Sequence, residues 1–276
     1  MVNPNDYASF DDFQRYNVSR LIDEFADDLI KMSGKCMDIG CGPGDITNDI
    51  LLSSLDPNAV IIGTDISQSM IEYANMTYSD EKRLGFEVLD TQTKNLPEKY
   101  VSEFDHIFSF HTLHWCKDIR QAFENIYRML RPGGTMLTLF VASHDTFNVF
   151  ELMAQNNYFA PYMEDVQRYV SPYLYSKNPR KEVKELVKSI GFKVYHCSHR
   201  DVTFSSKDSD NFLSAIMSIP AFLDKMPHDL IKEFKHNYAR EYMKRKISYT
   251  SICDNQEQKF ILDIHKVVIV YARKVI

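Results

Sequence analysis

The sequence predicts an α/β fold: a doubly wound, mostly parallel sheet of seven strands, flanked by helices and covered by a helical cap. Short apolar segments alternate with segments of helical periodicity, which is the pattern of βα units. A glycine-rich turn follows the first apolar segment, as in folds that bind a ligand at the ends of their strands. The chain of 276 residues is long enough for one such domain and a lid.

The expected strands are short segments bounded by glycine, proline or acidic residues, which mark turns. The second of them, 59–64, is almost wholly apolar, as a strand buried on both faces of a sheet should be. The seven strands are expected at 35–39, 59–64, 85–89, 104–110, 135–141, 192–204 and 266–272.

Helices are expected where apolar residues recur every three or four positions. The first, over 9–32, has acidic residues near its start and ends at Gly34. Ser67 is a candidate N-cap for a helix over 67–78. Further helices are expected at about 46–55, 118–130, 181–190 and 208–246, the last interrupted at Pro220 and Pro227.

The alternation of strands and helices stops after the fifth strand, where an irregular stretch rich in aromatic residues begins. We therefore expect four segments with different roles. Residues 1–32 form an N-terminal helical lid, and 33–142 form the ligand-binding core. Residues 143–258 form an aromatic-rich substrate cap that includes one helix and one strand of the core, and 259–276 supply the final core strand.

Composition argues against several classes of protein. The net charge of −6 gives no support for a nucleic-acid partner, which requires a basic face. The five cysteines are scattered and form no C-x-x-C pair or Cys/His cluster, so we expect reduced thiols and no metal site. No run approaches the roughly 18 apolar residues of a membrane span. We expect a cytoplasmic protein with a small-molecule partner.

The glycine-rich turn reads Asp38-Ile39-Gly40-Cys41-Gly42-Pro43-Gly44. A dinucleotide-binding turn reads G-x-G-x-x-G and binds a pyrophosphate. Here the third glycine comes one place early, and Asp45 takes the position of the last glycine. Two acids, Asp38 and Asp45, suit a cationic ligand better than a phosphate, and S-adenosylmethionine carries an ammonium and a sulfonium. The alternative is an ordinary glycine turn of an α/β protein.

This turn resembles motif I of the class I methyltransferases, D-x-G-x-G-x-G, and 63–70 resembles their second motif. The resemblance implies that Asp65 accepts hydrogen bonds from both ribose hydroxyls of S-adenosylmethionine. It also implies that Asp90 contacts the adenine, and that Asp38 orders the loop or meets the ammonium. The alternatives are a helix-capping role for Asp65 and a solvated turn for Asp90. The implied cofactor-binding residues are Asp38, Gly40, Cys41, Gly42, Gly44, Asp65, Ile66, Asp90, Thr91 and Ser109.

The fourth strand ends in Ser109-Phe110-His111-Thr112-Leu113-His114-Trp115. With Gln14 in the first helix, this string resembles the insect juvenile hormone acid methyltransferases, and the resemblance covers nearly the whole chain. It implies O-methylation of farnesoic acid or a juvenile hormone acid, with Gln14 and Trp115 donating neutral N–H groups to the carboxylate. An ionised carboxylate needs no strong base, so catalysis would be in-line positioning. The catalytic residues expected on this basis are Gln14, Trp115, His114 and His111.

Several alternatives stay open at this point. The chain could methylate another small molecule, or bind S-adenosylmethionine or a lipid without turnover. Either histidine could be a packed or solvated side chain, and Trp115 could belong to the core. The aromatic residues of 143–180 could line an apolar pocket for an isoprenoid tail, or form the core of the cap itself. The sequence also leaves a homodimer open.

Overall fold

The computed structural model describes residues 4, 12–206, 213–214, 216–217, 219–253 and 256–275. Its centre is a mixed sheet with the strand order β3-β2-β1-β4-β5-β8-β6, and β7 pairs with β8 outside this path. Strands β1 to β5 are parallel, and β8 runs antiparallel to β5 and to β6. The strands are β1 (Lys35–Ile39), β2 (Val60–Asp65), β3 (Leu84–Val88), β4 (Phe104–Phe110), β5 (Leu130–Ser143), β6 (Phe192–Ser206), β7 (Ile247–Cys253) and β8 (Gln256–Lys274).

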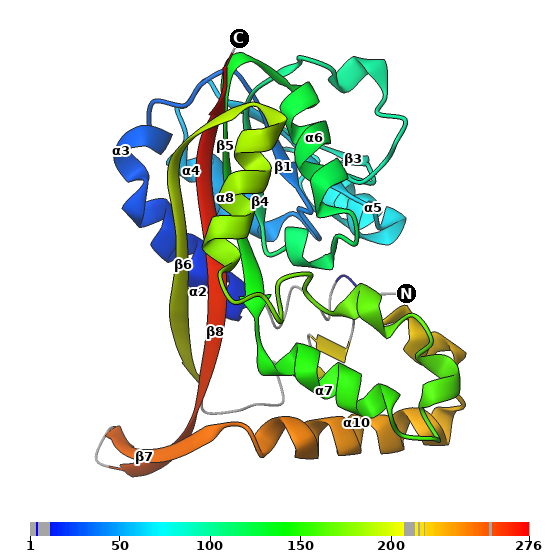
Figure 1. Ribbon diagram of the computed structural model, residues 1–276. Helices are drawn as coiled ribbons and strands as arrows, with labels where there is room; N and C mark the ends of the chain where they lie inside the picture. The colour runs from blue at the N-terminus through cyan, green and yellow to red at the C-terminus, as the bar shows by residue number, and fades with distance from the viewer. Residues whose placement is uncertain are drawn as a thin grey trace.

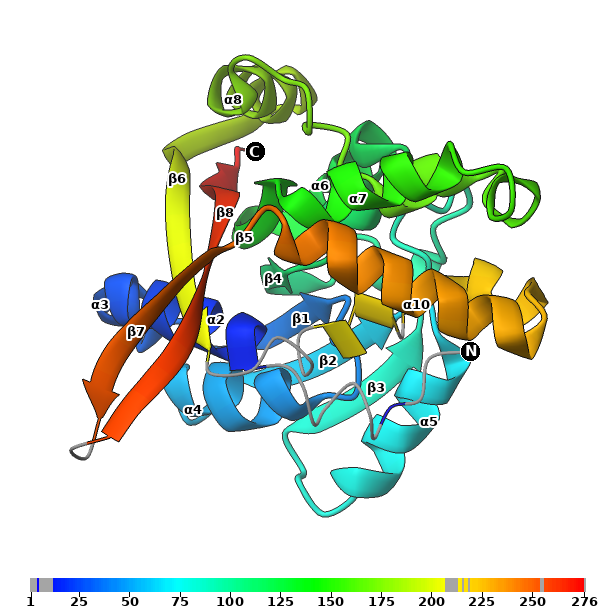
Figure 2. The ribbon, with the colours of Figure 1, turned by 90° about the horizontal axis from the view of Figure 1, so that it is seen from below.

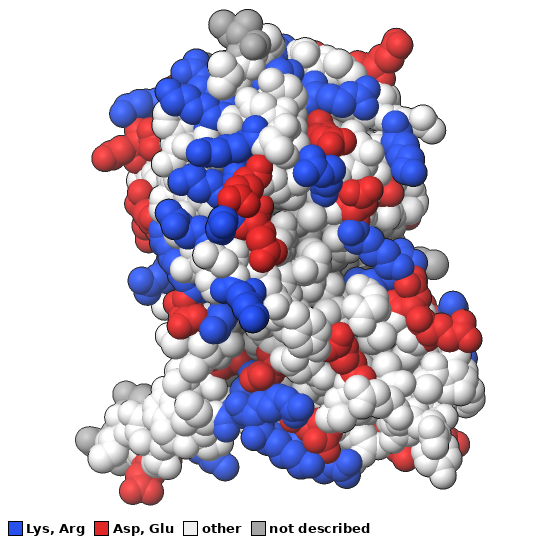
Figure 3. All heavy atoms as spheres, in the orientation of Figure 1, with Lys and Arg blue, Asp and Glu red and all other residues white. Residues whose placement is uncertain are grey.

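The predicted sheet of seven mostly parallel strands is confirmed, and the strand expected at 104–110 has the observed bounds. The largest difference lies near the end of the chain. Strand β8 begins ten residues earlier than expected and forms a hairpin with β7, which was not predicted. Figures 1 and 2 show this hairpin extending away from the body, and Figure 3 shows that its surface is mostly uncharged in that view.

Helices cover both faces of the sheet (Figure 2). The side chains of β8 show how this works, because Val267 and Ile269 face the cluster that contains α2, whereas Val268 and Val270 face the cluster that contains α6 and α8. Alternation of this kind buries a strand on both sides. The core helices are α2 (Asp12–Glu24), α3 (Ala26–Leu29), α4 (Leu52–Ser54), α5 (Gln68–Thr77), α6 (Ile119–Met129) and α8 (Pro179–Ile190).

Two helix predictions change in detail. Of the helix expected over 9–32, residues 9–11 lie outside the described part, and the rest is divided into α2 and α3 at Phe25. The helix after the glycine loop contains a π-helical turn, η1 (Thr47–Leu51), before α4. The predicted N-cap is confirmed, because the side chain of Ser67 accepts a hydrogen bond from the backbone N–H of Met70 at 3.4 Å.

A separate cap packs beyond the carboxyl ends of the strands (Figure 1). Its main helices are α7 (Asp145–Ala154) and α10 (His228–Met243), and Pro220 and Pro227 stand directly before η6 (Ala221–Lys225) and α10, as predicted. Aromatic residues such as Phe150, Phe159 and Tyr238 bury one another in a core of the cap's own. That packing favours the second interpretation for half of the eight aromatic residues in 143–180, namely Phe150, Phe159, Tyr162 and Tyr169. None of the described helices has the length and apolar character needed to cross a membrane.

Candidate functional site

The carboxyl ends of the first four strands surround a cavity of about 370 Å³. Parallel strands of a doubly wound sheet place their ligands at this edge. The structure brings eight of the ten predicted cofactor-binding residues to its wall: Asp38, Gly40, Cys41, Gly42, Asp65, Ile66, Asp90 and Thr91. Gly44 and Ser109 do not line it.

The glycine loop is held against the start of the cavity by backbone contacts. The N–H groups of Gly40 and Cys41 donate to the carbonyl of Thr64 at 2.6 and 3.0 Å. Gly40 has a φ of 75°, and a Cβ there would lie 2.0 Å from Oγ1 of Thr112. Only glycine fits such a position, because both the conformation and the space exclude a side chain.

Gly44 and Ser109 have structural contacts instead. A Cβ on Gly44 would lie 2.8 Å from the ring of Phe86, so this glycine allows the loop to pack on α5 and β3. The buried hydroxyl of Ser109 donates to the carbonyl of Ile39 at 3.0 Å and ties β4 to β1. Both residues support the wall of the cavity from behind.

Asp38 is the buried acid at the base of the loop. Its Oδ2 accepts a hydrogen bond from the hydroxyl of Thr47 at 2.6 Å. Burial raises the pKa of Asp38 to about 7, and the nearby carboxylates of Asp65 and Asp45 add to this effect. A cation in the cavity would favour the ionised form, so the site suits a ligand with an ammonium group. Of the two acids expected to attract the cation, Asp45 is already paired with Arg15 at 2.8 Å.

Asp65 and Asp90 occupy the ends of their strands as expected. Asp65 accepts from the N–H groups of Gly42 at 3.1 Å and Ser67 at 2.8 Å, and burial raises its pKa. Asp90 accepts from the N–H of Gln92 at 2.9 Å. Each carboxylate therefore orders a turn and also faces the cavity, so the structural and ligand-binding interpretations are compatible.

A second, much smaller cavity of about 30 Å³ adjoins the first. The two share Gln14, His111, Trp115 and Ile219 on their walls. His111 has a φ of 54°, which is rare for a residue other than glycine and marks strain of a kind common at functional sites. Its buried Nε2 has no hydrogen-bond partner in the described part of the chain, and burial lowers the pKa of His111 to about 3. His111 is therefore a neutral side chain between the two cavities.

His114 lines only the smaller cavity. Its Nδ1 accepts the N–H of Val141 at 3.3 Å, so in the neutral ring the proton is on Nε2. Burial holds the pKa of His114 well below its usual value, and the nearby His111 and His144 contribute. Trp115 lies beside His114, with ring centroids 4.5 Å apart. All four predicted catalytic residues thus meet at one junction.

Sequence reasoning missed a buried ionic cluster behind this junction. His144 and His265 both line the smaller cavity, and their rings stack 3.6 Å apart. Nε2 of His144 lies 3.0 Å from the carboxylate of Asp263, which also binds Tyr242 and Lys246. These residues are far apart in the chain, and β7 and β8 bring them together, so no local pattern could have indicated the cluster.

The cluster also has the composition of a metal site, since candidate ligand atoms of His144, Asp263 and His265 lie within 4.8 Å of one another. The ammonium of Lys246, whose side chain is 1% exposed, already binds the carboxylate of Asp263. Burial raises the pKa of Asp263, but the neighbouring histidines and Lys246 lower it by more than burial raises it. The pKa of Asp263 is therefore well below its usual value. An ionised Asp263 and a charged Lys246 form a buried ion pair, which places a protein cation where a metal ion would bind.

Comparison with known proteins agrees with this geometry. A family model described as a methyltransferase domain matches residues 37–136. A juvenile hormone acid O-methyltransferase of Drosophila melanogaster is 32% identical over 272 residues, which cover 97% of this chain and 91% of the relative. This chain belongs to the juvenile hormone acid O-methyltransferase family. A second member, from Bombyx mori, is 31% identical, and the match covers 99% of this chain and 98% of that relative.

The fold of this juvenile hormone acid O-methyltransferase family member is also found among solved structures. Phosphoethanolamine N-methyltransferase 2 of Haemonchus contortus, in complex with S-adenosylmethionine, superposes with a TM-score of 0.54 at 20% identity. The match covers 95% of this chain and 53% of that one. The cavity suits S-adenosylmethionine, because Gly40 and Gly42 bring the loop backbone to its wall without side chains, and a cation there would favour the ionised form of the buried Asp38.

Proposed function

We propose that this protein transfers the methyl group of S-adenosylmethionine to the carboxylate of an apolar isoprenoid acid, such as farnesoic acid or a juvenile hormone acid. The observation that carries the proposal is the junction between the two cavities. There Gln14, His114 and Trp115, each a neutral side chain with an N–H group, line the smaller cavity next to the cofactor cavity. The names of the two relatives support the choice of acceptor.

These donors suit a carboxylate that acts as the nucleophile. The acid is ionised at neutral pH, so no residue has to remove a proton. Neutral N–H groups can hold one oxygen while leaving charge on the other, whereas a cationic side chain would reduce its nucleophilicity. S-adenosylmethionine supplies the electrophilic methyl group, and Gln14, His114 and Trp115 orient the acid toward it. Most of the rate enhancement then comes from positioning.

The acceptor cavity is nearly closed in this structure. Its volume of about 30 Å³ is that of roughly one water molecule, far less than an isoprenoid chain occupies. Its walls come from α2, the segment that follows β4, Val141 of β5, the start of α7 and β8, together with Ile216 and Ile219. Binding of the acid therefore requires the lid or the cap to move away from the core. This supports our division into a lid at 1–32, a core at 33–142 and 259–276, and a cap at 143–258.

The acceptor cavity also corrects one expectation, because its wall is not simply apolar. Four histidines line it together with Phe13, Phe147 and Trp115. An isoprenoid tail must therefore extend toward the apolar side chains of the cap once the cavity opens. The negative net charge supports a small-molecule acceptor rather than a nucleic acid, and the buried free cysteines support a cytoplasmic location.

Incubation with S-adenosylmethionine labelled in its methyl group and a panel of acids tests the proposal. We expect labelled esters from farnesoic and juvenile hormone acids, and none from acetate or quinones. A protein that binds the cofactor but labels no acid would be the non-catalytic alternative, and preferred labelling of another acceptor would indicate a different methyltransferase. Light scattering after size-exclusion chromatography separates a homodimer from a monomer.

A further inference from the structure

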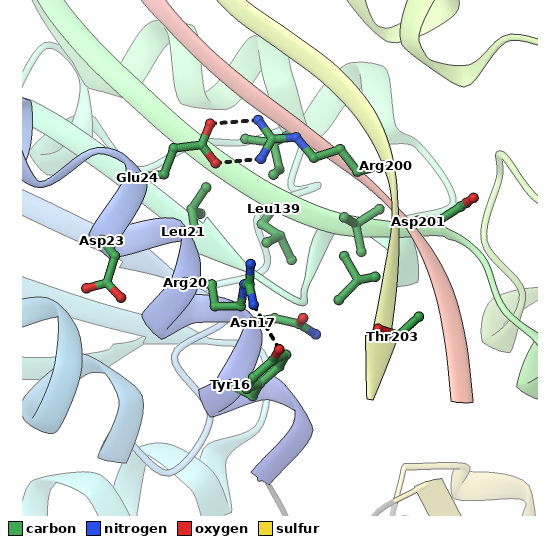
Figure 4. Close-up of a pocket in the computed structure, with 13 residues that line it drawn as sticks. Tyr16, Asn17, Arg20, Leu21, Asp23, Glu24, Leu139, Arg200, Asp201 and Thr203 are labelled. Carbon is green, nitrogen blue, oxygen red and sulfur yellow. Dashed lines mark hydrogen bonds and ion pairs between the residues drawn. The ribbon is translucent and has the colours of Figure 1, made fainter. Parts of the chain in front are cut away.

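A groove of about 530 Å³ lies outside the methyl-transfer site, between α2 and the face of β5, β8 and β6 (Figure 4). It shares no lining residue with either cavity of that site. We call it the α2 groove. Its lining residues are Tyr16, Asn17, Arg20, Leu21, Asp23, Glu24, Leu139, Arg200, Asp201, Val202, Thr203, Val267 and Ile269.

The base of the α2 groove is apolar. Leu139 and Ile269 are register partners in β5 and β8, so their side chains lie together on the sheet face that α2 covers. Val267 and Leu21 extend the same surface, and all four residues are at most 4% exposed. A ligand that lies on this base must be largely apolar, because these four side chains offer it no polar group.

Asn17 is an unsatisfied polar group at this base. Its side chain extends from α2 toward β6 in Figure 4, and the residue is only 3% exposed. Neither the amide oxygen nor the amide nitrogen has a hydrogen-bond partner in the described part of the chain. Buried amides of this kind are rare in proteins and need an explanation, of which a ligand that binds the amide is one.

Arg20 lies one helical turn after Asn17 on the same side of α2. It donates a hydrogen bond to the hydroxyl of Tyr16 at 3.0 Å, and it makes no ion pair with any described residue. Arg200, on the opposite wall, differs because Glu24 binds it with both oxygens, at 2.5 and 2.7 Å. Within the described part of the chain, the groove therefore contains a guanidinium that binds Tyr16 but no carboxylate, beside an amide that has no hydrogen-bond partner.

The charges around the groove limit the ligand further. Asp23, Glu24 and Asp201 stand on its walls, so a dianion such as a phosphate monoester would meet more repulsion than a monoanion. We propose that the α2 groove binds an apolar monocarboxylate, with its chain on Leu139, Val267 and Ile269 and its carboxylate between Arg20 and Asn17. The inference does not depend on the proposed function, because no residue of the groove takes part in methyl transfer.

Photoaffinity labelling tests this site directly. The probe is dodecanoic acid with a diazirine near its methyl end, and labelled peptides are identified by mass spectrometry. We expect labels in 16–24, 139, 200–203 and 267–269, and we expect them to persist when S-adenosylhomocysteine is present. Unlabelled dodecanoate or farnesoate should compete, which shows whether a straight or an isoprenoid chain is preferred. Dodecyl phosphate and methyl dodecanoate should compete poorly.

Matched variants decide whether the two polar groups recognise the carboxylate. Arg20→Gln and Asn17→Leu should each reduce labelling of the groove by about tenfold, the effect of losing one charge-assisted hydrogen bond. Arg20→Lys should keep most of it, and Asp23→Asn should keep or increase it. Circular dichroism checks that each variant is folded. Labelling that is confined to 111–115 and 144–150, or that Arg20→Gln leaves unchanged, would overturn the proposal.

Discussion

The backbone N–H of Gly42 donates a hydrogen bond to Oδ2 of Asp65 at 3.1 Å. This bond joins the glycine loop after β1 to the acid at the end of β2. Because Oδ1 of Asp65 accepts from Ser67, one carboxylate orders both the loop and the start of α5 while it faces the cofactor cavity.

Asp65→Ala should weaken binding of S-adenosylmethionine. The variant loses the acceptor expected for the two ribose hydroxyls, and each charge-assisted hydrogen bond contributes about 1.5–3 kcal/mol. We expect an affinity at least tenfold lower by isothermal titration calorimetry, with the fold retained in circular dichroism. Unchanged affinity would show that Asp65 is only a turn residue.

Binding of S-adenosylmethionine should depend on the ionisation of Asp38. Its pKa is raised to about 7 by burial, so below pH 7 the carboxyl is mostly protonated in the free protein. A bound ammonium favours the charged form, so binding should release a proton and tighten as the pH rises from about 5 to about 7. Calorimetry in buffers of different ionisation enthalpy counts the protons. The Asp38→Asn variant should bind S-adenosylmethionine without releasing this proton. Proton release by the variant would show that another group is responsible.

The same shift affects folding. The folded pKa of Asp38 lies above the unfolded value of 3.8, so the folded chain binds more protons in this interval. The contribution of Asp38 to stability is therefore complete below about pH 4 and is lost as the pH rises to about 7. Urea unfolding without cofactor measures the free energy of unfolding at each pH. In the Asp38→Asn variant, the decrease of this free energy between about pH 4 and pH 7 that Asp38 causes should be absent.

Trp115→Phe should lower kcat/KM for the acid by about ten- to a hundredfold while affinity for S-adenosylmethionine barely changes. The substitution keeps an aromatic ring beside His114 and Phe147 but deletes the indole N–H. Trp115 is the only tryptophan, so its fluorescence in the wild type should respond to the acid. Wild-type turnover by the variant would reduce Trp115 to a packing role.

Gln14→Glu should be more harmful than Gln14→Ala. Glutamate has almost the same shape as glutamine but places a negative charge against the substrate carboxylate, whereas alanine only removes a donor. We expect the alanine variant to lose about tenfold in kcat/KM and the glutamate variant more. Steady-state kinetics should therefore give a lower kcat/KM for Gln14→Glu than for Gln14→Ala. An equally active Gln14→Glu protein would place the carboxylate elsewhere.

Asp263→Asn should destabilise the protein strongly, because it leaves the ammonium of Lys246 buried with a weaker set of partners. Removing one member of a buried ion pair costs about 3–5 kcal/mol. Glu124→Gln is the matched control, since it breaks the exposed pair with Arg120 and should cost less than about 1 kcal/mol. Denaturant unfolding measures both, and similar losses would contradict the structural role of Asp263.

Local patterns were sufficient to predict which residues gather around the cavity at the carboxyl ends of the strands. The loop from Asp38 to Gly44 and the acids after β2 and β3 follow buried strands, and parallel strands bring such ends together. Gly44 and Ser109 do not line this cavity, and a motif alone does not say which of its members face the ligand. In this chain Phe86 and the carbonyl of Ile39 occupy the space beside them.

Contacts between distant segments could not be predicted. The cluster around Asp263 needs β8 to place that residue beside His144, 119 positions earlier in the chain. The periodicity of apolar residues along the sequence does not show which residues of two distant strands pair with each other. The α2 groove was missed for a similar reason, because it depends on where α2 lies relative to Arg200 on β6.

The position of β8 also constrains the order in which the molecule can be completed. It follows β5 and β6 in the chain but lies between them in the sheet. As the ribosome makes the protein, β6 emerges before the strand that it pairs with. The rest of the cap is then synthesised before β8, the partner of β6, appears. Unpaired strand edges invite aggregation. The nascent chain therefore keeps the edges of β5 and β6 unpaired until β8 has been made and closes the sheet.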